Sequence, residues 1–534
     1  MYKNFANSDQ TEFNADVCII GAGANGIACA LNLIESGLRV ILLEGGLQVY
    51  DDKAADLHKS QVVGQPHIGI HEARERIVGG TTTKWGGQAL PFMKEDFEKR
   101  DHINLSGWPI CYDDLKPYYK KAEEILGTDS LVPYNYNPWQ SRKINKPDFT
   151  LNKLELIVTK WCKIPNFAIK HGSKIAQSIE VTLLYNANAV DVIPNYLLNS
   201  VSALKIKSLD GKEGFINSKY FVAAGGTIET VRLFMSATKF GKRGLGNEKG
   251  LVGRYFQDHA AAVVGRIVPT SLNKFQNIFD PFYLRGFKYF PRVKLNPKYA
   301  NKEALLHSSA QFIYSDNQYD PLAIAKTFIN SIKKREPTSY KEIKYLFTPK
   351  RVLQVVKAAL RWKVLHRGSS TKNGNIWLEI HSEQEPDFES KIKLALVKDN
   401  LGMRRVKLHW NISKLTLKTI RDTAKLIQEE FEKSGFGKVL LEPWVLNGEK
   451  ETSAYIVDTF HQCGGLRMAN TPSRGVVDSD CKVFGIDNLY VSSAAVFPTS
   501  SFSNPTMTSI ALAIRLSDKI ISELKLNQTA LQYG

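Results

Sequence analysis

The first fifty residues combine two short apolar runs with a helical pattern between them. Asp16 to Ile20 is an apolar run typical of a buried parallel strand, and Val40 to Leu43 is a second one. Between the two runs, apolar residues recur at helical spacing: Ile27, Leu31 and Ile34. Gly37 predicts the end of that helix. The pattern therefore predicts a strand–helix–strand unit at the start of the chain.

Further apolar patterns predict elements near the C-terminus. Residues 391–397 and 406–410 alternate as half-buried strands do, which suits an antiparallel sheet. Residues 417–433 predict an amphipathic helix whose apolar face contains Ile420, Ala424, Ile427 and Phe431. Leu489 to Val491 is a short strand-like run.

Three glycines follow the first predicted strand at GxGxxG spacing: Gly21, Gly23 and Gly26. Together with both strands, the helix and Glu44 at the end of the second strand, they form a dinucleotide-binding fingerprint in its full context. The glycines allow a tight turn, and the free N–H groups of the helix N-terminus face a pyrophosphate. Glu44 can accept hydrogen bonds from both ribose hydroxyls and would repel a 2′-phosphate. The alternative is a glycine turn in another kind of α/β domain.

A histidine and an asparagine near the C-terminus are candidates for proton chemistry. His461 lies beside two glycines, and Asn504 precedes Pro505. Histidine exchanges protons most readily near neutral pH, whereas an asparagine side chain donates or accepts without charge. Such a pair could take a proton from an alcohol and hold the resulting oxygen. A structural histidine is the alternative, and we expect Cys463 nearby to be a packing residue rather than a nucleophile.

Composition indicates an ordinary globular protein of two or three domains. The chain has 534 residues, of which 43% are hydrophobic and 23% charged. It contains no apolar run of roughly eighteen residues, no signal-type leader and no internal repeat. The six cysteines lack metal or haem spacing, so we expect no metal site and a reducing cytoplasmic location. Cys18 and Cys29 fall within predicted elements and should be core residues.

Several segments, in order along the chain, resemble the glucose–methanol–choline (GMC) family of flavin oxidoreductases. They include IVGGTTTKWGG at 77–87, FVAAGGTIETVRLFMSA at 221–237, GRYFQDHA at 253–260 and EQEPDFESKIKL within 383–410. GWPICYDDLKPYYKKAEEILG at 107–127 is similar to the sugar-oxidising branch, which includes pyranose oxidase and the fructose and gluconate dehydrogenases. The resemblance spans nearly the whole chain.

This resemblance implies an α/β fold in which a Rossmann-like FAD-binding domain is interleaved with an α+β substrate domain. The substrate domain is expected to contain a largely antiparallel sheet. We expect the FAD-binding domain at 1–112, 186–262 and 452–524, and a connecting or cap segment at 113–185. The substrate domain is expected at 263–451, with a basic helical insertion at 324–367.

The resemblance also assigns roles to individual residues. FAD is expected to contact the following: Gly21, Gly23, Gly26, Glu44, Gly79, Gly80, Thr81, Trp85, Gly86, Val190, Asn504, Pro505 and Thr506. His461 matches the histidine that accepts the hydroxyl proton while hydride leaves to flavin N5, and Asn504 matches its partner. Lys84 stands where some relatives carry a histidine bonded to the flavin, so we expect non-covalent FAD.

The predicted basic insertion concentrates the positive charge of the chain. It contains twelve Lys or Arg residues against two acids, a net charge of +10 out of +18 overall. Thr348 and Pro349 predict the start of an amphipathic helix extending to about 367. Its apolar face could pack on the substrate domain, or the helix could lie peripherally on an anionic membrane. Nucleic acid is not expected as a partner, since no nucleic-acid fold accompanies the charge.

The sequence therefore predicts an FAD-dependent enzyme that oxidises an alcohol group on a sugar, glycoside or polyol. One alternative is oxidation of an apolar or lipid-linked alcohol at a membrane surface. Others are a flavin-containing lyase without net redox chemistry and a non-catalytic, membrane-docked flavoprotein. The electron acceptor stays open among oxygen, a quinone, a carrier protein and a partner subunit.

Overall fold

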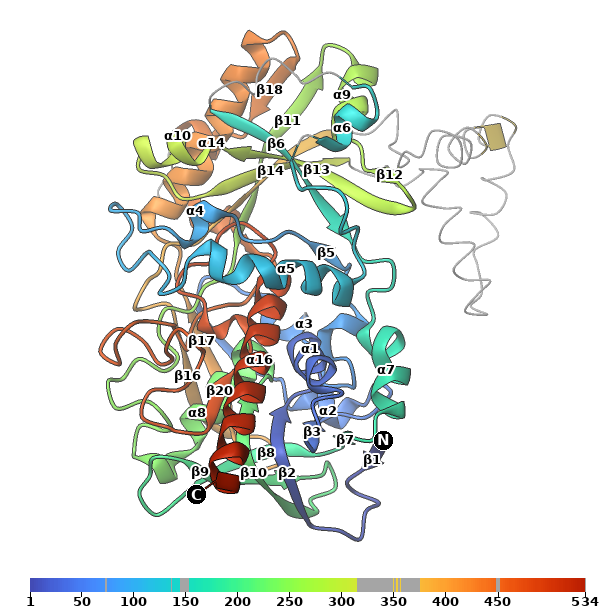
Figure 1. The fold of residues 1–534 in the computed structure, drawn as a ribbon. Helices are drawn as coiled ribbons and strands as arrows, with labels where there is room; N and C mark the ends of the chain where they lie inside the picture. Colours follow the sequence, from blue (N-terminus) through green and yellow to red (C-terminus); the bar gives the residue numbers. More distant parts are fainter. Residues whose placement is uncertain are drawn as a thin grey trace.

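The computed structural model describes residues 1–72, 74–135, 137–144, 153–314, 375–447 and 452–533, with four isolated positions between 349 and 356. Two large sheets occupy opposite halves of the molecule (Figure 1). The helices around these sheets include α2 (Asp52–Asp56), α3 (Gly69–Glu72), α4 (Lys94–Phe97), α6 (Asn137–Ser141), α7 (Phe167–Gln177), α8 (Gly226–Ser236), α9 (Leu272–Phe279), α10 (Pro297–Lys302) and α15 (Pro443–Asn447).

An eight-stranded sheet fills the lower half of Figure 1. Its order is β1-β7-β3-β2-β10-β9-β8, with β20 beside β10, and the strands from β1 to β10 pair in parallel. The last six residues of β2 are all buried, as expected of a parallel strand covered on both faces. The strands are β1 (Tyr2–Asn4), β2 (Glu12–Ile20), β3 (Val40–Leu43), β7 (Val181–Tyr185), β8 (Asn188–Pro194), β9 (Val201–Lys207), β10 (Glu213–Ala223) and β20 (Leu489–Val491).

Helix α1 (Ala24–Leu33) connects β2 to β3 and packs against the long C-terminal helix α16 (Pro505–Tyr533). Helix α5 (Tyr112–Leu126) packs on α16 in turn. The predicted strand–helix–strand unit is confirmed, but Gly37 as the helix end is wrong. The helix stops at Leu33, and Gly37 has a φ of 79° in the turn before β3, where its glycine freedom serves the turn instead.

A nine-stranded antiparallel sheet fills the upper half of Figure 1 and confirms the expected fold class. Its order is β18-β11-β15-β14-β13-β6-β5, with β12 on β13 and β19 on β11. Helix α14 (Lys414–Lys433) packs on this sheet through the four apolar residues predicted for its buried face. The strands are β5 (Gln88–Ala89), β6 (Leu154–Trp161), β11 (Ala260–Pro269), β12 (Phe282–Leu284), β13 (Phe287–Leu295), β14 (Ser308–Tyr314), β15 (Ile376–Ser382), β18 (Gly437–Leu441) and β19 (Val457–Asp458).

Two predicted strands join a different sheet from the one expected. Strands β16 (Lys391–Lys398) and β17 (Arg404–Trp410) pair antiparallel, as their alternation suggests. However, they form a separate three-stranded sheet with β4 (Gln61–Gly64), which pairs in parallel with β17 and comes from the N-terminal part of the chain. This small sheet packs on α8, because the apolar face of an alternating strand can be buried by any suitable partner.

The chain passes between the two large sheets more than once. Strands β6 and β7 both lie in the predicted connecting segment 113–185, yet β6 joins the antiparallel sheet and β7 the parallel one. The domain boundaries stay a prediction. The basic insertion 324–367 lies outside the described residues apart from the four isolated positions.

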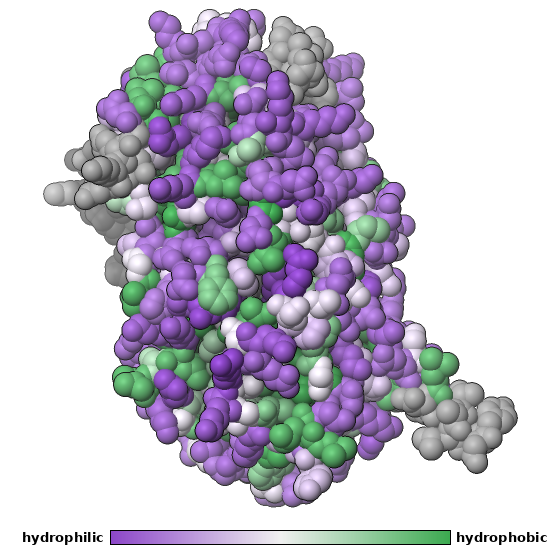
Figure 2. All heavy atoms as spheres, turned by 90° about the vertical axis from the view of Figure 1, so that its left-hand side faces the viewer, coloured by the Kyte–Doolittle hydropathy of each residue, from purple (hydrophilic) through white to green (hydrophobic). Residues whose placement is uncertain are grey.

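Hydrophilic side chains dominate the face shown in Figure 2, and hydrophobic ones are scattered among them. Within the described part of the chain, we find no helix with the length and apolar character needed to cross a membrane.

Candidate active site

A cavity of about 750 Å³ runs from the parallel sheet to the antiparallel one. Ile20, Leu43 and Ala223, at the carboxyl ends of β2, β3 and β10, line one end of it. Nucleotides bind at this edge of open α/β sheets. Of the residues predicted to contact FAD or substrate, eleven line the cavity: Gly21, Gly23, Glu44, Gly80, Thr81, Trp85, Gly86, His461, Asn504, Pro505 and Thr506.

Three of the predicted site residues, Gly26, Gly79 and Val190, do not line the cavity. A Cβ on Gly26 would overlap the carbonyl oxygen of Gly21, so this glycine lets the helix approach the turn. Val190 is skipped by the ladder between β8 and β9, whose register shifts from residue 189 to residue 191. Its proposed backbone contact with adenine stays a prediction.

The two glycine segments meet at the centre of the cavity. Gly80 opens the 3₁₀ turn η1 (Gly80–Thr83), and a Cβ there would lie 2.9 Å from the Cα atom of Gly23. Gly80 also has a φ of 54°, which favours glycine for a second reason. Thr82 fixes the turn by accepting a hydrogen bond of 3.0 Å from the N–H of Phe167 at the start of α7. The N–H of Gly79 donates to the carbonyl of Ala22 at 2.9 Å, and this bond holds the two glycine segments against each other.

Glu44 closes the nucleotide end of the cavity. It is 6% exposed, and its carboxylate accepts hydrogen bonds from the N–H groups of Ala22 (3.2 Å) and Gly46 (2.9 Å). Burial raises the pKa of Glu44, and these two N–H groups with Arg76 oppose the rise. The carboxylate thus links the glycine turn after β2 with the loop after β3, where a ribose would lie.

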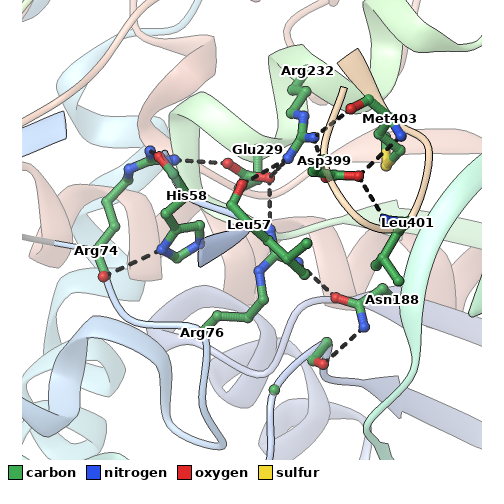
Figure 3. Close-up of polar contacts among 12 residues, drawn as sticks. Leu57, His58, Arg74, Arg76, Asn188, Glu229, Arg232, Asp399, Leu401 and Met403 are labelled. Carbon is green, nitrogen blue, oxygen red and sulfur yellow. Dashed lines mark hydrogen bonds and ion pairs between the residues drawn. The ribbon is translucent and has the colours of Figure 1, made fainter. Parts of the chain in front are cut away.

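Three arginines converge on Glu229 beside the nucleotide end (Figure 3). Arg74 and Arg76 each lie 2.7 Å from its carboxylate, and Arg232 lies 3.2 Å away while also pairing with buried Asp399. Burial would raise the pKa of Glu229, but the arginines outweigh it and hold that pKa well below its usual range. This network joins the loop before the second glycine segment to α8 and to the small sheet.

Arg76 carries the network to the adenosine side of the cavity. Its guanidinium donates to the side-chain oxygen of Asn188 at 3.0 Å, and the amide of Asn188 donates to the carbonyl of Gly45 at 3.0 Å (Figure 3). The sequence analysis singled out neither Arg74, nor Arg76, nor Asn188. The pair of arginines in ARER, directly before the second glycine segment, was the available signal.

His461 and Asn504 meet where the cavity reaches the antiparallel sheet. The amide nitrogen of Asn504 lies 2.9 Å from Nε2 of His461. Nδ1 of His461 lies 2.9 Å from the hydroxyl of Thr459 and 3.0 Å from Nδ1 of His259. Burial, then the fields of His259, His381 and Arg292, lowers the pKa of His461 well below its usual value. The imidazole is therefore neutral near neutral pH and is able to accept a proton.

Asp258 holds the segment that carries His461. Its Oδ1 accepts from the backbone N–H groups of His461 (2.9 Å) and Thr459 (3.3 Å), and its Oδ2 accepts from Nε2 of His67 (3.1 Å). His67, Asp258 and Asp458 lie close enough together to bind a metal ion. However, the ligand atoms of His67 and Asp458 already accept hydrogen bonds from backbone N–H groups, and His67 also donates to Asp258, so hydrogen bonds within the protein engage all three side chains. The sequence motif GRYFQDHA contained Asp258 and His259, but no role was assigned to them.

Acidification is expected to destabilise the fold through His259. Burial lowers the pKa of His259 to about 4, whereas a histidine in an unfolded chain titrates near about 6.5. Between these values the unfolded chain binds a proton that the folded chain does not, so the free energy of unfolding falls as pH drops from about 6.5 to about 4. Urea unfolding at pH 7 and pH 5 measures this fall. Between pH 7 and pH 5, the free energy of unfolding of the variant His259→Asn should fall less than that of the wild type. The control Lys302→Gln, which changes an exposed side chain, should show the same fall as the wild type. An equal loss in His259→Asn would contradict the assignment.

Comparisons with known proteins agree with this arrangement. The family model "FAD dependent oxidoreductase" matches residues 16–113, and "GMC oxidoreductase" matches residues 386–513. The C-terminal part of the chain is therefore similar to the GMC oxidoreductases, and its N-terminal part to FAD-dependent oxidoreductases. It is 22% identical to the fructose dehydrogenase large subunit of Gluconobacter japonicus, over 96% of this chain and 98% of that one. It is also 22% identical to 2-methyl-1,2-propanediol dehydrogenase of Mycolicibacterium austroafricanum, over 96% of each chain. Formate oxidase shares the fold, with a TM-score of 0.58 at 15% identity over 97% of this chain and 99% of that one.

FAD, the cofactor of this enzyme, fits the cavity. A Cβ on Gly23 would meet no protein atom within 4 Å, although Gly23 lines the cavity, so the space beside this backbone is open for a pyrophosphate. At the other end, Oδ1 of Asn504 is buried and has no hydrogen-bond partner among the described residues. The open backbone at one end and the unpartnered amide oxygen at the other match a long polar ligand.

The cysteines of the enzyme have structural positions. Cys18 and Cys29 are buried in β2 and α1, as expected from the sequence. Cys463 is completely buried, and burial raises the pKa of its thiol well above the ordinary value. A protonated, inaccessible thiol is a poor nucleophile, so its prediction as a packing residue is confirmed.

Proposed function

We propose that this enzyme oxidises an alcohol group of a sugar, glycoside or polyol, with His461 as the proton acceptor. The observation that carries the proposal is the contact of His461 with Asn504 at 2.9 Å, at the meeting point of the nucleotide cavity and the antiparallel sheet. The names of the relatives support the substrate class, because fructose and 2-methyl-1,2-propanediol each carry more than one hydroxyl.

The residues around the pair suit proton transfer from an alcohol. The substrate hydroxyl takes the place of the Asn504 amide at Nε2 of neutral His461 and gives its proton to that nitrogen, while Asn504 hydrogen-bonds the oxygen from which the proton came. Thr459 can accept a hydrogen bond from Nδ1 of the resulting imidazolium, and Asp258 holds the backbone of both residues in place. FAD, when bound, supplies the acceptor for the hydride from the same carbon.

The test is anaerobic reduction of the bound flavin. The purified enzyme is mixed without oxygen with sugars, glycosides, polyols and simple alcohols, and its visible absorption is followed. Bleaching by the polyhydroxylated compounds supports the proposal. Bleaching by apolar alcohols alone would favour the membrane-linked alternative, and a flavin that no alcohol bleaches would overturn alcohol oxidation and favour a lyase.

We further propose that FAD is held without a covalent bond. Lys84 occupies the position of the flavin-linked histidine of some relatives and lines the cavity next to Trp85. Its ammonium group pairs with Glu75, so we expect it to form no bond to the flavin. Precipitation of the enzyme with acid should release all yellow colour into the supernatant. Colour that stays with the pellet after denaturation would contradict this prediction. The cytoplasmic location and the peripheral membrane contact stay predictions, and the electron acceptor stays open among oxygen, a quinone, a carrier protein and a partner subunit.

A further inference from the structure

We propose that Arg292 and His381 form a subsite that binds a second hydroxyl of the substrate, distinct from the hydroxyl that is oxidised. The inference rests on the proposed function and extends it, because it makes the enzyme selective for polyhydroxylated alcohols over alcohols with a single hydroxyl. Neither residue was among those expected from the sequence.

The antiparallel sheet places these side chains on one face. Glu379 and His381 are two residues apart on β15, so they point to the same side of the sheet. Gln311 on β14 lies directly opposite Glu379, and Arg292 on the next strand, β13, donates to Gln311 at 3.1 Å. Arg292, Gln311 and His381 line the same cavity as His461 and Asn504.

Arg292 is a buried cation with an unused donor. Its side chain is 3% exposed, and its two terminal nitrogens donate to the neutral oxygens of Ser309 (3.3 Å) and Gln311 (3.1 Å). Its Nε–H has no hydrogen-bond partner among the described residues. Burial lowers the pKa of Arg292 to about 10, and the field of Glu379 opposes that fall. A buried donor left without a partner is costly, so its position on a cavity indicates a ligand.

His381, which lines the same cavity, presents an unused acceptor. Its Nε2 lies 2.7 Å from the Glu379 carboxylate and 3.0 Å from the amide nitrogen of Gln311. Because the carboxylate can only accept, the shorter contact assigns the ring proton to Nε2. Gln311 donates to the same carboxylate. Burial lowers the pKa of His381, so the ring is neutral and Nδ1 keeps a lone pair. Nδ1 is buried and has no hydrogen-bond partner in the part of the chain that the structure describes.

One donor and one acceptor on the same cavity wall match a hydroxyl group. A hydroxyl can accept from Nε–H of Arg292 and donate to Nδ1 of His381, whereas a carboxylate only accepts and a methyl group does neither. The nearby Glu379 carboxylate also disfavours a substrate anion. The fields of Arg292 and His381 both lower the pKa of His461, so the subsite lies within electrostatic reach of the proton acceptor.

The experiment compares substrates that differ by one hydroxyl. Anaerobic flavin reduction is measured with a polyol that the wild type oxidises and with each of its singly deoxygenated analogues. Arg292→Leu should raise the half-saturating polyol concentration about 10- to 100-fold, as expected for a hydrogen bond to a charged group. For the analogue that lacks the bound hydroxyl, the half-saturating concentration should rise much less in the same variant, because that hydrogen bond is already absent. Arg266→Leu, on β11 of the same sheet and away from the cavity lining, is the matched control.

A binding readout separates recognition from turnover. Polyol binding to His461→Ala, followed by perturbation of the flavin spectrum, should weaken about 10- to 100-fold when Arg292→Leu is added. If Arg292→Leu does not retain flavin, Arg292→Lys and His381→Leu carry the same comparison. Equal losses with the polyol and all of its analogues, or a preference for hydroxy acids over polyols, would overturn the subsite while alcohol oxidation stands. A wild-type flavin that no alcohol bleaches would overturn both proposals.

Discussion

Replacement of His461 by alanine is expected to slow anaerobic flavin reduction by a factor of about 10² to 10⁴, the usual cost of losing a general base. The flavin should stay bound, because the nucleotide end of the cavity is built from Glu44 and the glycine segments rather than from His461. Stopped-flow absorption measures the rate, and the visible spectrum measures flavin content.

Controls for this variant come from the chain itself. His102→Ala removes a half-buried histidine that contacts the carbonyl of Leu305 and does not line the cavity, so it should reduce its flavin at the wild-type rate. Because burial and neighbouring charges lower the pKa of His461, the wild-type rate should stay level between about pH 8 and pH 6. A His461→Ala enzyme that is reduced as fast as the wild type would show that another group accepts the proton.

Replacement of Glu229 by glutamine is expected to lower the free energy of unfolding by about 3–5 kcal/mol. The carboxylate is the shared partner of Arg74, Arg76 and Arg232, and its loss leaves buried positive charge poorly compensated. FAD affinity should fall as well, since Arg76 and Asn188 line the adenosine side of the cavity. Urea unfolding and flavin release on dilution measure the two effects.

An exposed carboxylate provides the matched control for Glu229. Glu213 also pairs with two cations, Lys205 at 2.6 Å and Lys207 at 2.8 Å, but on the surface of the molecule. Glu213→Gln should change stability little, because solvent screens exposed pairs. A Glu229→Gln protein as stable as the wild type would show that the three arginines do not depend on this carboxylate.

Local patterns in the sequence were sufficient for the nucleotide unit. The apolar runs, the glycine spacing and Glu44 lie within thirty residues of one another, so strand, turn and helix follow from short-range sterics and hydrogen bonding. The helix α14 and the strands β16 and β17 were identifiable for the same reason. The end of α1 was not, because Ile34 continues the helical spacing of apolar residues and yet is the C-cap, three residues before Gly37.

The position of His461 beside Asn504 was expected only through the family resemblance, not from spacing. By itself the sequence determined the nucleotide fingerprint, the two glycine segments and the identity of the candidate proton acceptor. Only the tertiary structure decided that Asp258 holds the His461 segment, that three arginines share Glu229, and that Arg292 and His381 line the same cavity. These contacts join residues far apart in the chain, and the periodicity of a strand specifies which face is buried but not which strand lies next to it.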